Sequence, residues 1–360
     1  MLPIPAHNKR PCRIVITGGA GFLGVLLARS LLTTGTLAFS GGDAVEIDRI
    51  TLVDRVEPPA DLLADARVRA VTGDLNALLQ DANRITTVIP DDASLVFHLA
   101  AAVSGECEAD FDLGMRSNVA ATLALLERCR ALNTRPMLVF SSSLAVFGDA
   151  PGQPMPNTLD DNTLPTPQSS YGIQKFIGEQ LVADYTRKGF VQGRSVRLMT
   201  VSVRPGKPNG AASGFLSGIL REPLAGLRAA CPVPADTPVA LSSAACSIAG
   251  LIRAATSSDE TWGPRTALTL PALTTTPTEM AAALARVAGP AIAALIDWVP
   301  DAAIHNIVKT WPARIHAQRA ANLGLLPEAS FDDIIRAYVQ ENPQSIHPPQ
   351  PSHPQPAAAN

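Results

Sequence analysis

The chain has 360 residues, of which 46% are hydrophobic and 17% charged, and its formal net charge is −3. This composition excludes general disorder, and the length is enough for about two domains. The small net charge gives no reason to expect a nucleic acid or an anionic membrane as a partner. The cysteines are scattered and form no Cys-x-x-Cys pair, so we predict reduced thiols and no metal site.

Neither a secretion signal nor a membrane span is predicted. The N-terminal residues 1–11 carry prolines at positions 3, 5 and 11, where a signal peptide needs an unbroken apolar stretch. No uninterrupted apolar run of about 18 residues occurs in the sequence. We therefore expect a soluble protein of the cytoplasm.

A glycine-rich turn follows the first predicted strand. Residues 12–17 have the apolar, β-branched character of a buried strand, and apolar periodicity over residues 25–32 predicts a helix. Gly18, Gly21 and Gly24 lie between them with the spacing Gly-x-x-Gly-x-x-Gly. Glycines let the backbone approach a pyrophosphate closely, and the free amides at the helix start face that anion. Strand, turn and helix in this order predict a dinucleotide site.

Acidic residues follow the next two predicted strands. Residues 49–54 end in Asp54, whose carboxylate is placed to accept hydrogen bonds from both adenosine ribose hydroxyls. The same charge would repel a 2′-phosphate, so we predict NAD rather than NADP, although Arg55 directly after it stands against this preference. A helix cap or turn residue is the alternative for Asp54. Residues 68–71 form a third strand before Asp74, which we expect to accept a hydrogen bond from the adenine amino group.

Further strands are predicted at 94–101, 137–140 and 196–199, with a long helix at 111–132. Strands that alternate with helices predict a doubly wound parallel sheet with helices on both faces. Ligands of such sheets bind at the carboxyl ends of the strands. The residues that follow strands and should therefore meet at one edge are Gly18, Asp54, Asp74, Ala100 and Ser143.

His98 lies inside the apolar strand 94–101. We predict a buried, hydrogen-bonded histidine here rather than a catalytic one.

Tyr171 and Lys175 lie four residues apart in a predicted helix and so project from one face. A nearby ammonium favours the phenolate and should lower the tyrosine pKa from its usual value of about 10. Such a tyrosine can act as a general acid or base on an alcohol. For this pair alone, the alternative is a packed ring beside a solvated ammonium.

The composition changes after about residue 200. Helices are predicted at 213–221, 243–256, 278–289, 313–323 and 331–340, and strands near 238–241 and 266–270. We predict an α/β protein with an N-terminal extension (1–11), a Rossmann-type domain (12–195) and a smaller mixed α/β substrate domain (196–341), from which some segments return to the sheet. Residues 342–360 are rich in proline and are expected to be disordered.

Together these motifs resemble the extended short-chain dehydrogenase/reductase family, in its NAD-dependent epimerase/dehydratase branch. The resemblance covers about residues 12–340. Its motifs are the glycine turn, Asp54, Asp74, residues 98–101, Asn118, the serine run before residues 146–148, and Tyr171-x-x-x-Lys175. Phe147 stands where the family usually has tyrosine.

The resemblance implies a role for each matching residue. Tyr171 would be the catalytic base, Lys175 would bind the nicotinamide ribose and lower the tyrosine pKa, and Ser143 would hydrogen-bond the reacting oxygen. Ser141 and Ser142 are neighbours that could share that last role. The implied NAD contacts are Gly18, Gly21, Phe22, Leu23, Gly24, Asp54, Asp74, Leu75, Leu99, Ala100, Ala101, Asn118, Tyr171 and Lys175. A homodimer through the helices 111–132 and 171–187 is also implied.

Segments 103–114, 203–209 and 218–224 are similar to a group of this family that oxidises C2 of a four-carbon sugar acid with NAD. A small aldonate needs a cation for its carboxylate and polar side chains for its hydroxyls. The candidates are Ser104, Ser143, Thr200, Arg204, Lys207 and Asn209, and for each a surface salt bridge or a loop cap is the alternative. Uronate dehydrogenase, nucleotide-sugar 4-epimerase and a non-catalytic NAD-sensing protein are the alternative functions.

Overall fold

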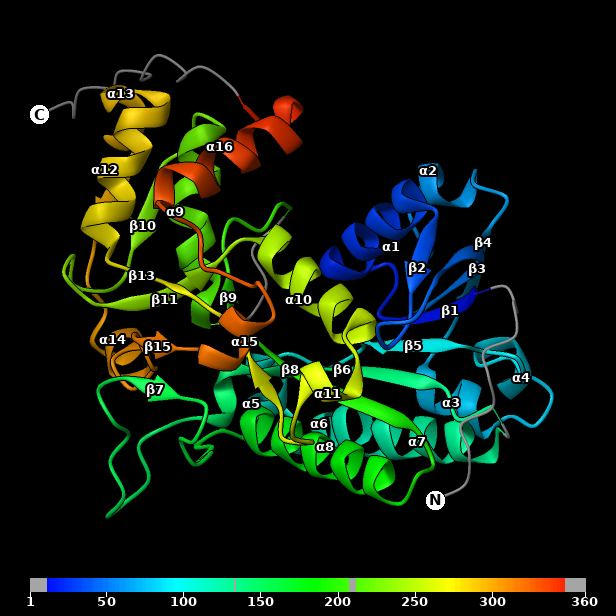
Figure 1. The fold of residues 1–360 in the computed structure, drawn as a ribbon. Coiled ribbons are helices and arrows are strands. Elements are labelled where there is room, and N and C mark those ends of the chain that lie inside the picture. Colours follow the sequence, from blue (N-terminus) through cyan, green and yellow to red (C-terminus); the bar gives the residue numbers. More distant parts are fainter. Residues whose placement is uncertain (1–11, 133, 207–211, 347–360) are drawn as a thin grey trace, which may run out of the picture.

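The computed structural model describes residues 12–132, 134–206 and 212–346. At its centre is a parallel sheet with the strand order β12-β8-β6-β5-β1-β3-β4 (Figure 1). Its strands are β1 (Cys12–Thr17), β3 (Ala44–Asp54), β4 (Val68–Thr72), β5 (Leu95–His98), β6 (Met137–Ser143), β8 (Gln192–Leu198) and β12 (Leu268–Thr269). A short strand, β2 (Thr36–Ala38), pairs antiparallel with β3. The predicted Rossmann-type α/β fold is confirmed.

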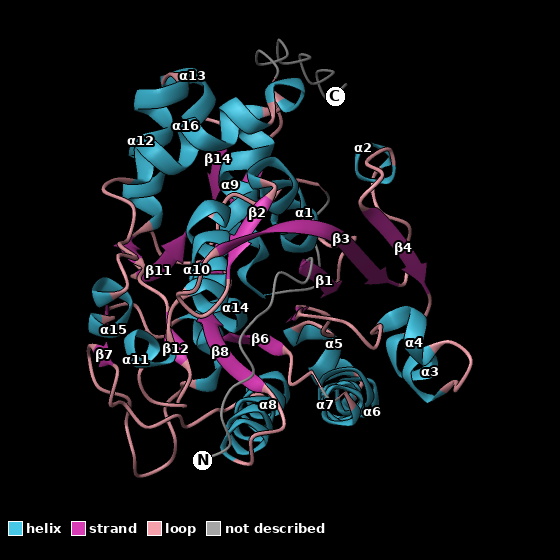
Figure 2. Cartoon of the chain, turned by 45° about the vertical axis from the view of Figure 1, so that its right-hand side comes forward, coloured by secondary structure: helices cyan, strands magenta, loops and turns pink. Residues whose placement is uncertain are grey.

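The sheet is buried on both faces, as side-chain alternation along β1 illustrates. Ile14 and Ile16 belong to the core on one face, whereas Val15 belongs to the core on the other. The first face is covered by α1 (Phe22–Thr34) and α10 (Ala244–Thr256), and the second by α3 (Leu75–Gln80), α7 (Ala121–Ala131) and α8 (Ser170–Arg187) (Figures 1 and 2). A continuous apolar strand fits this two-sided burial.

The structure corrects several predicted boundaries. The predicted strand 49–54 begins earlier, at Ala44, the strand 94–101 ends at His98, and the strand at 196–199 begins at Gln192. The helix predicted at 111–132 is interrupted: α6 (Phe111–Gly114) leads into a π-helical turn (Met115–Ala120) before α7. Hydrophobic periodicity does not reveal one inserted residue in a helix.

The helix predicted at 313–323 is mostly wrong. Residues 315–316 form β15 (Ile315–His316), which pairs with β7 (Leu159–Asp160), and only α15 (Gln318–Asn322) is helical. This pairing joins segments more than 150 residues apart, so local sequence carries no signal for it.

The C-terminal part of the chain forms a second hydrophobic core. It is built around α9 (Phe215–Leu224), α12 (Pro277–Ala288) and α16 (Phe331–Glu341). Two small sheets accompany it: β9 (Thr200–Val201), β11 (Val239–Ser242) and β13 (Leu273–Thr275) form one, and β10 (Ala229–Cys231) and β14 (Ile296–Trp298) the other. The domain limits proposed above stay a prediction. Of the predicted disordered tail, residues 343–345 form a short 3-10 turn, and residues 347–360 lie outside the described residues.

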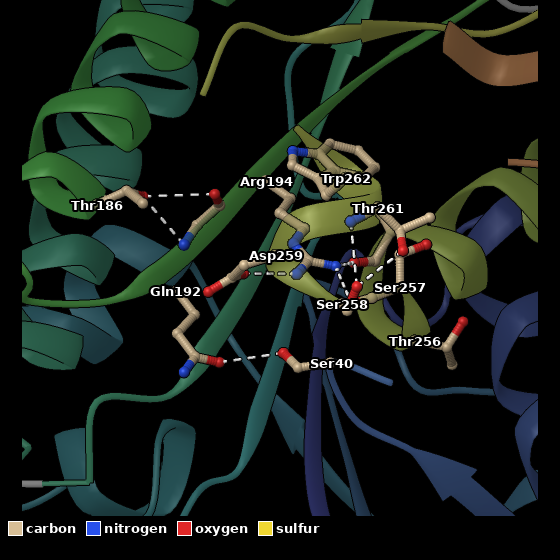
Figure 3. A network of polar contacts seen from close by, with 12 residues as sticks. Ser40, Thr186, Gln192, Arg194, Thr256, Ser257, Ser258, Asp259, Thr261 and Trp262 are labelled. Atoms are coloured by element: carbon tan, nitrogen blue, oxygen red, sulfur yellow. Dashed lines mark hydrogen bonds and ion pairs between the residues drawn. The ribbon is translucent and has the colours of Figure 1, made fainter. Parts of the chain in front are cut away.

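A segment of the C-terminal part returns to the large sheet. Arg194 on β8 is buried and donates hydrogen bonds to the main-chain oxygens of Ala254 (2.6 Å) and Ser257 (2.7 Å) at the end of α10 (Figure 3). It also pairs with Asp259 of α11 (Asp259–Trp262) at 2.8 Å, and the Trp262 ring lies 5.2 Å from its guanidinium carbon. These contacts attach α10 and α11 to β8, and β12 pairs with β8 as the edge strand of the sheet. Within the described ranges, no helix is both long and apolar enough to cross a membrane.

Candidate active site

A cavity of about 1120 Å³ lies at the carboxyl ends of the central strands. The predicted residues that line it are Gly18, Gly21, Phe22, Leu23, Gly24, Asp54, Leu75, Leu99, Ala100, Ala101, Ser104, Ser143, Tyr171, Lys175, Thr200 and Arg204. Asp74 and Asn118 are outside this lining, and Lys207 and Asn209 lie outside the described residues. The structure therefore brings most of the predicted site to one place.

The glycine turn leaves no room for side chains. A Cβ at Gly18 would lie 2.8 Å from the main-chain nitrogen of Ala100, and one at Gly24 would collide with the oxygen of Gly18. Gly18 also has a φ of 73°, which favours glycine. The first helical hydrogen bond of α1 is from Val25 N–H to the oxygen of Gly21 (2.9 Å), so the amides of residues 22–24 at the helix start are free to meet an anion. This turn fits a dinucleotide pyrophosphate.

Asp54 connects the glycine turn to the end of β3. Its carboxylate accepts hydrogen bonds from the amides of Ala20 (3.0 Å) and Arg55 (2.6 Å) and faces the cavity. Asp74 caps α3 through the amide of Ala77 (3.2 Å) and pairs with Arg55 at 3.0 Å, and its contact with adenine stays a prediction. The Arg55 cation is thereby paired with a carboxylate beside the predicted ribose site.

Asn118 does not line the cavity but bonds Ala102, which does. Its side chain lies in the π-helical turn, is buried, and bonds both the amide (2.8 Å) and the oxygen (3.2 Å) of Ala102. It also donates to Gln174 of α8 at 2.8 Å. Through these bonds Asn118 holds the loop after β5, whose residues line the cavity, against α8, the helix that carries Tyr171 and Lys175.

Close packing brings Tyr171 to Ser143. Ser169 caps α8 by accepting from the amide of Gly172 (3.1 Å), and a Cβ at Gly172 would collide with the main-chain oxygen of Ala145. The start of α8 therefore lies directly on the segment after β6, and the Ser143 side chain is close enough to Tyr171 to lower its pKa. Both residues line the cavity, as a catalytic pair requires.

The expected lowering of the Tyr171 pKa by Lys175 is wrong. Burial raises the pKa of Tyr171, while the nearby Ser143 side chain and the charge of Arg204 act in the opposite direction. Lys175 is buried, and burial lowers its pKa to about 8. Its ammonium lies 5.7 Å from the centre of the tyrosine ring and bonds the oxygen of Ser141 (2.8 Å). Desolvation, which a helical spacing cannot reveal, dominates here.

Sequence reasoning missed a buried ion pair behind the site. Glu179, one turn after Lys175, accepts two hydrogen bonds from Arg197 (2.8 and 2.7 Å) and one from Ser142 (2.5 Å). The guanidinium carbon of Arg197 lies 4.8 Å from the centre of the Phe147 ring. Arg197 within the predicted strand 196–199, whose other residues are apolar, was the available signal, because a buried charge needs a partner.

His98 is a structural residue, as predicted. Its ring is buried between Thr17 (2.7 Å) and Thr122 (2.9 Å), and burial lowers its pKa to about 3. It therefore stays neutral near pH 7. The five cysteines are free, and in the described part of the chain no cluster of three or more His, Cys, Asp or Glu side chains could hold a metal ion.

A family model supports the geometry. The model described as "NAD dependent epimerase/dehydratase family" matches residues 14–236, which contain the glycine turn, Asp54, Ser143, Tyr171 and Lys175. The chain belongs to this family. Its cofactor is NAD, and the free amides and tight glycine turn described above fit that dinucleotide.

Relatives within the NAD-dependent epimerase/dehydratase family cover nearly the whole chain. D-erythronate dehydrogenase of Cupriavidus necator is 52% identical over 91% of this chain and 98% of its own, and that of Haemophilus influenzae is 40% identical over 91% and 99%. The crystal structure of a nucleoside-diphosphate-sugar epimerase from Agrobacterium tumefaciens is similar with a TM-score of 0.84 and 38% identity, over 94% of this chain and 97% of that one. Like its dehydrogenase relatives, this chain is an NAD-dependent oxidoreductase.

Proposed function

We propose that the enzyme oxidises the C2 hydroxyl of D-erythronate with NAD, giving 2-dehydro-D-erythronate (2-oxo-tetronate). The observation that carries this proposal is the shared location of Arg204 and Tyr171. Both line the cavity, and they are close enough for the Arg204 charge to act on the pKa of the tyrosine. A carboxylate bound by Arg204 would place the adjacent C2 hydroxyl beside Tyr171. Two relatives named D-erythronate dehydrogenase add support.

Arg204 is the best-placed cation for the substrate. Its Nε donates to the oxygen of Val201 (3.1 Å), and its own main chain is held by Ser217 (3.0 Å) and Arg221 (2.8 Å). Glu106 and Glu108 also line the cavity, but they accept from the amides of Val103 and Ser170 at helix starts. A positioned guanidinium can hold a carboxylate through two hydrogen bonds.

The reaction divides into a proton and a hydride. Tyr171 takes the proton of the C2 hydroxyl, and Ser143 holds the oxygen as the carbonyl forms. Bound NAD would supply the acceptor for the hydride that leaves C2. Lys175, anchored at the end of β6 by Ser141, would bind the nicotinamide ribose and favour the phenolate once that ribose lies beside it. Ser104 and Thr200 line the cavity and would bind the remaining hydroxyls.

A panel of sugar acids tests this proposal. NADH formation is followed with four- to six-carbon aldonates and uronates, with NADP run in parallel. The highest kcat/KM is expected for D-erythronate with NAD. A higher value for a uronate would identify a uronate dehydrogenase. Conversion of a nucleotide sugar without net NADH would identify an epimerase, and NAD binding without any turnover would identify a sensor.

We also infer a homodimer in a reducing compartment, the cytoplasm. Phe111, Leu123 and Ile173 expose apolar side chains on α6, α7 and α8, the helices expected at the interface. Free cysteines are typical of reduced compartments. Light scattering should give a dimer, and Phe111→Glu should shift it toward monomer. A monomeric wild-type protein would contradict the inference.

A further inference from the structure

Trp311 lines two cavities. The C-terminal part of the chain closes the main cavity with Ser213, Ile307, Trp311 and Pro312. Trp311 also lines a second cavity of about 320 Å³. The other residues of that cavity are Pro234, Asp236, Thr237, Pro238, His305 and Lys309. Among the described residues, Trp311 alone lines both cavities.

Trp311 is held in place from both directions along the chain. On its N-terminal side is α14 (Ala302–Val308), where Val308 is fully buried and accepts a hydrogen bond from the Trp311 amide (3.0 Å). On its C-terminal side, the Ala313 oxygen accepts from the Thr274 hydroxyl (2.7 Å), and the next residues pair with β7. Pro312 restricts the backbone between these two anchors. A wall fixed in this way can exclude a ligand by its shape.

The direction of the substrate makes this wall important. With a carboxylate on Arg204 and C2 beside Tyr171, the remaining carbons must lie in the part of the cavity that the dinucleotide leaves free. Ser213, Ile307 and Trp311 are the lining residues that the C-terminal part of the chain contributes together with Pro312. Each added carbon brings a hydroxyl that needs hydrogen-bond partners. The indole ring and the Ile307 side chain cannot accept a hydrogen bond, which leaves only the Ser213 hydroxyl among these side chains.

We propose that Trp311 sets the upper limit on the length of the sugar acid by forming the wall between the two cavities. This inference rests on the proposed function, because it places the acid at Arg204 and Tyr171. The second cavity is then the space that a longer acid would enter if the indole were smaller. Its polar residues, Thr237, His305 and Lys309, offer hydrogen-bonding groups that the apolar wall withholds.

The test compares Trp311→Ala, Trp311→Phe and the matched control Trp298→Ala. Trp298 lies on β14, is 44% exposed and belongs to neither cavity. For each protein, kcat/KM is measured with NAD for D-erythronate and for a six-carbon aldonate, D-gluconate. The ratio of the six-carbon to the four-carbon value should rise about 10-fold or more in Trp311→Ala. It should rise less in Trp311→Phe and stay unchanged in Trp298→Ala.

Binding measurements distinguish an error in the role of Trp311 from an error in the proposed function. Calorimetry gives the affinity of both acids for each protein saturated with NADH, without turnover. If wild type oxidises D-erythronate and Trp311→Ala keeps the wild-type preference in both turnover and binding, only the role of Trp311 as a wall is overturned. If wild type is inactive on D-erythronate but Trp311→Ala binds longer acids better than wild type does, only the proposed substrate is overturned. If Trp311→Ala does not fold, Trp311→Phe and Ile307→Ala are scored by the same ratio.

Discussion

The ammonium of Lys175 lies 5.7 Å from the centre of the Tyr171 ring and is held by the main-chain oxygen of Ser141 at 2.8 Å. Burial shifts the pKa of each of these side chains toward its neutral form: upward for the tyrosine, downward to about 8 for the lysine. Burial at this position therefore disfavours both the phenolate and the ammonium.

The lowered pKa of Lys175 predicts a pH dependence of stability. Between pH about 8 and about 10.4, the folded protein has lost the Lys175 proton while the unfolded chain still binds it. The unfolded state binds more protons, so the free energy of unfolding rises with pH in this window. Relative to Lys175→Met, the cofactor-free wild type should gain about 3 kcal/mol across it.

Urea unfolding at pH 8, 9 and 10 measures this gain. Lys188→Met is the control, because Lys188 is exposed at the end of the same helix. A constant difference between wild type and Lys175→Met over this range would show that the lysine titrates normally.

The pair Glu179–Arg197 predicts a large loss of stability. Both side chains are buried, so Glu179→Gln leaves Arg197 charged without its partner and should lower the free energy of unfolding by about 3–5 kcal/mol. Asp184→Asn, which breaks an exposed ion pair with Arg187 on the same helix, should have little effect. Chemical unfolding compares the two, and equal effects would refute the structural importance of the buried pair.

The sheet and the glycine turn could be predicted from the sequence because their signals are local. The apolar run 12–17 and the glycine spacing after it predict β1, the turn and α1 correctly. The cap of α3 and the ion pair with Arg55 at Asp74 were not predicted, because an acidic residue after a strand does not reveal which groups its carboxylate binds. The sign of the Tyr171 shift depends on burial, which a spacing of four residues does not contain.

The lining residues Ile307, Trp311 and Pro312 were also missed by the sequence analysis, but for a different reason. Trp311 reaches the cavity because β15 pairs with β7 and Thr274 bonds Ala313. These contacts join segments far apart in the chain, and two-residue strands have no periodicity to recognise. Residues placed by such contacts become visible only in the folded structure.

Asp54 predicts the choice of coenzyme. Its carboxylate faces the cavity beside the glycine turn, where it would repel the 2′-phosphate of NADP. Asp54→Asn should reduce the preference for NAD by about 10- to 100-fold, because one charge repulsion is removed and Arg55 remains nearby. The ratio of the kcat/KM values with NAD and with NADP measures this preference. Asp61→Asn is the control, because Asp61 forms an exposed ion pair with Arg29. An unchanged ratio would assign the discrimination to other residues.

Arg204 predicts the recognition of the acid. Loss of a charge-assisted hydrogen bond in Arg204→Gln should lower kcat/KM for D-erythronate by about 10- to 100-fold, mainly through KM. Arg204→Lys should retain part of the affinity, whereas Arg228→Gln, at an exposed pair with Asp297, should match wild type. NADH affinity should not change in any of the three. Equal KM values for Arg204→Gln and wild type would place the substrate carboxylate elsewhere.

The most direct test is the turnover of Tyr171→Phe with D-erythronate and NAD. Removal of the hydroxyl should lower kcat by about 10²- to 10⁴-fold, the usual contribution of a positioned acid–base group. NADH binding should be retained, and Tyr185→Phe on the same helix should turn over normally. A Tyr171→Phe enzyme with near-normal kcat would contradict the assignment of this tyrosine as the base.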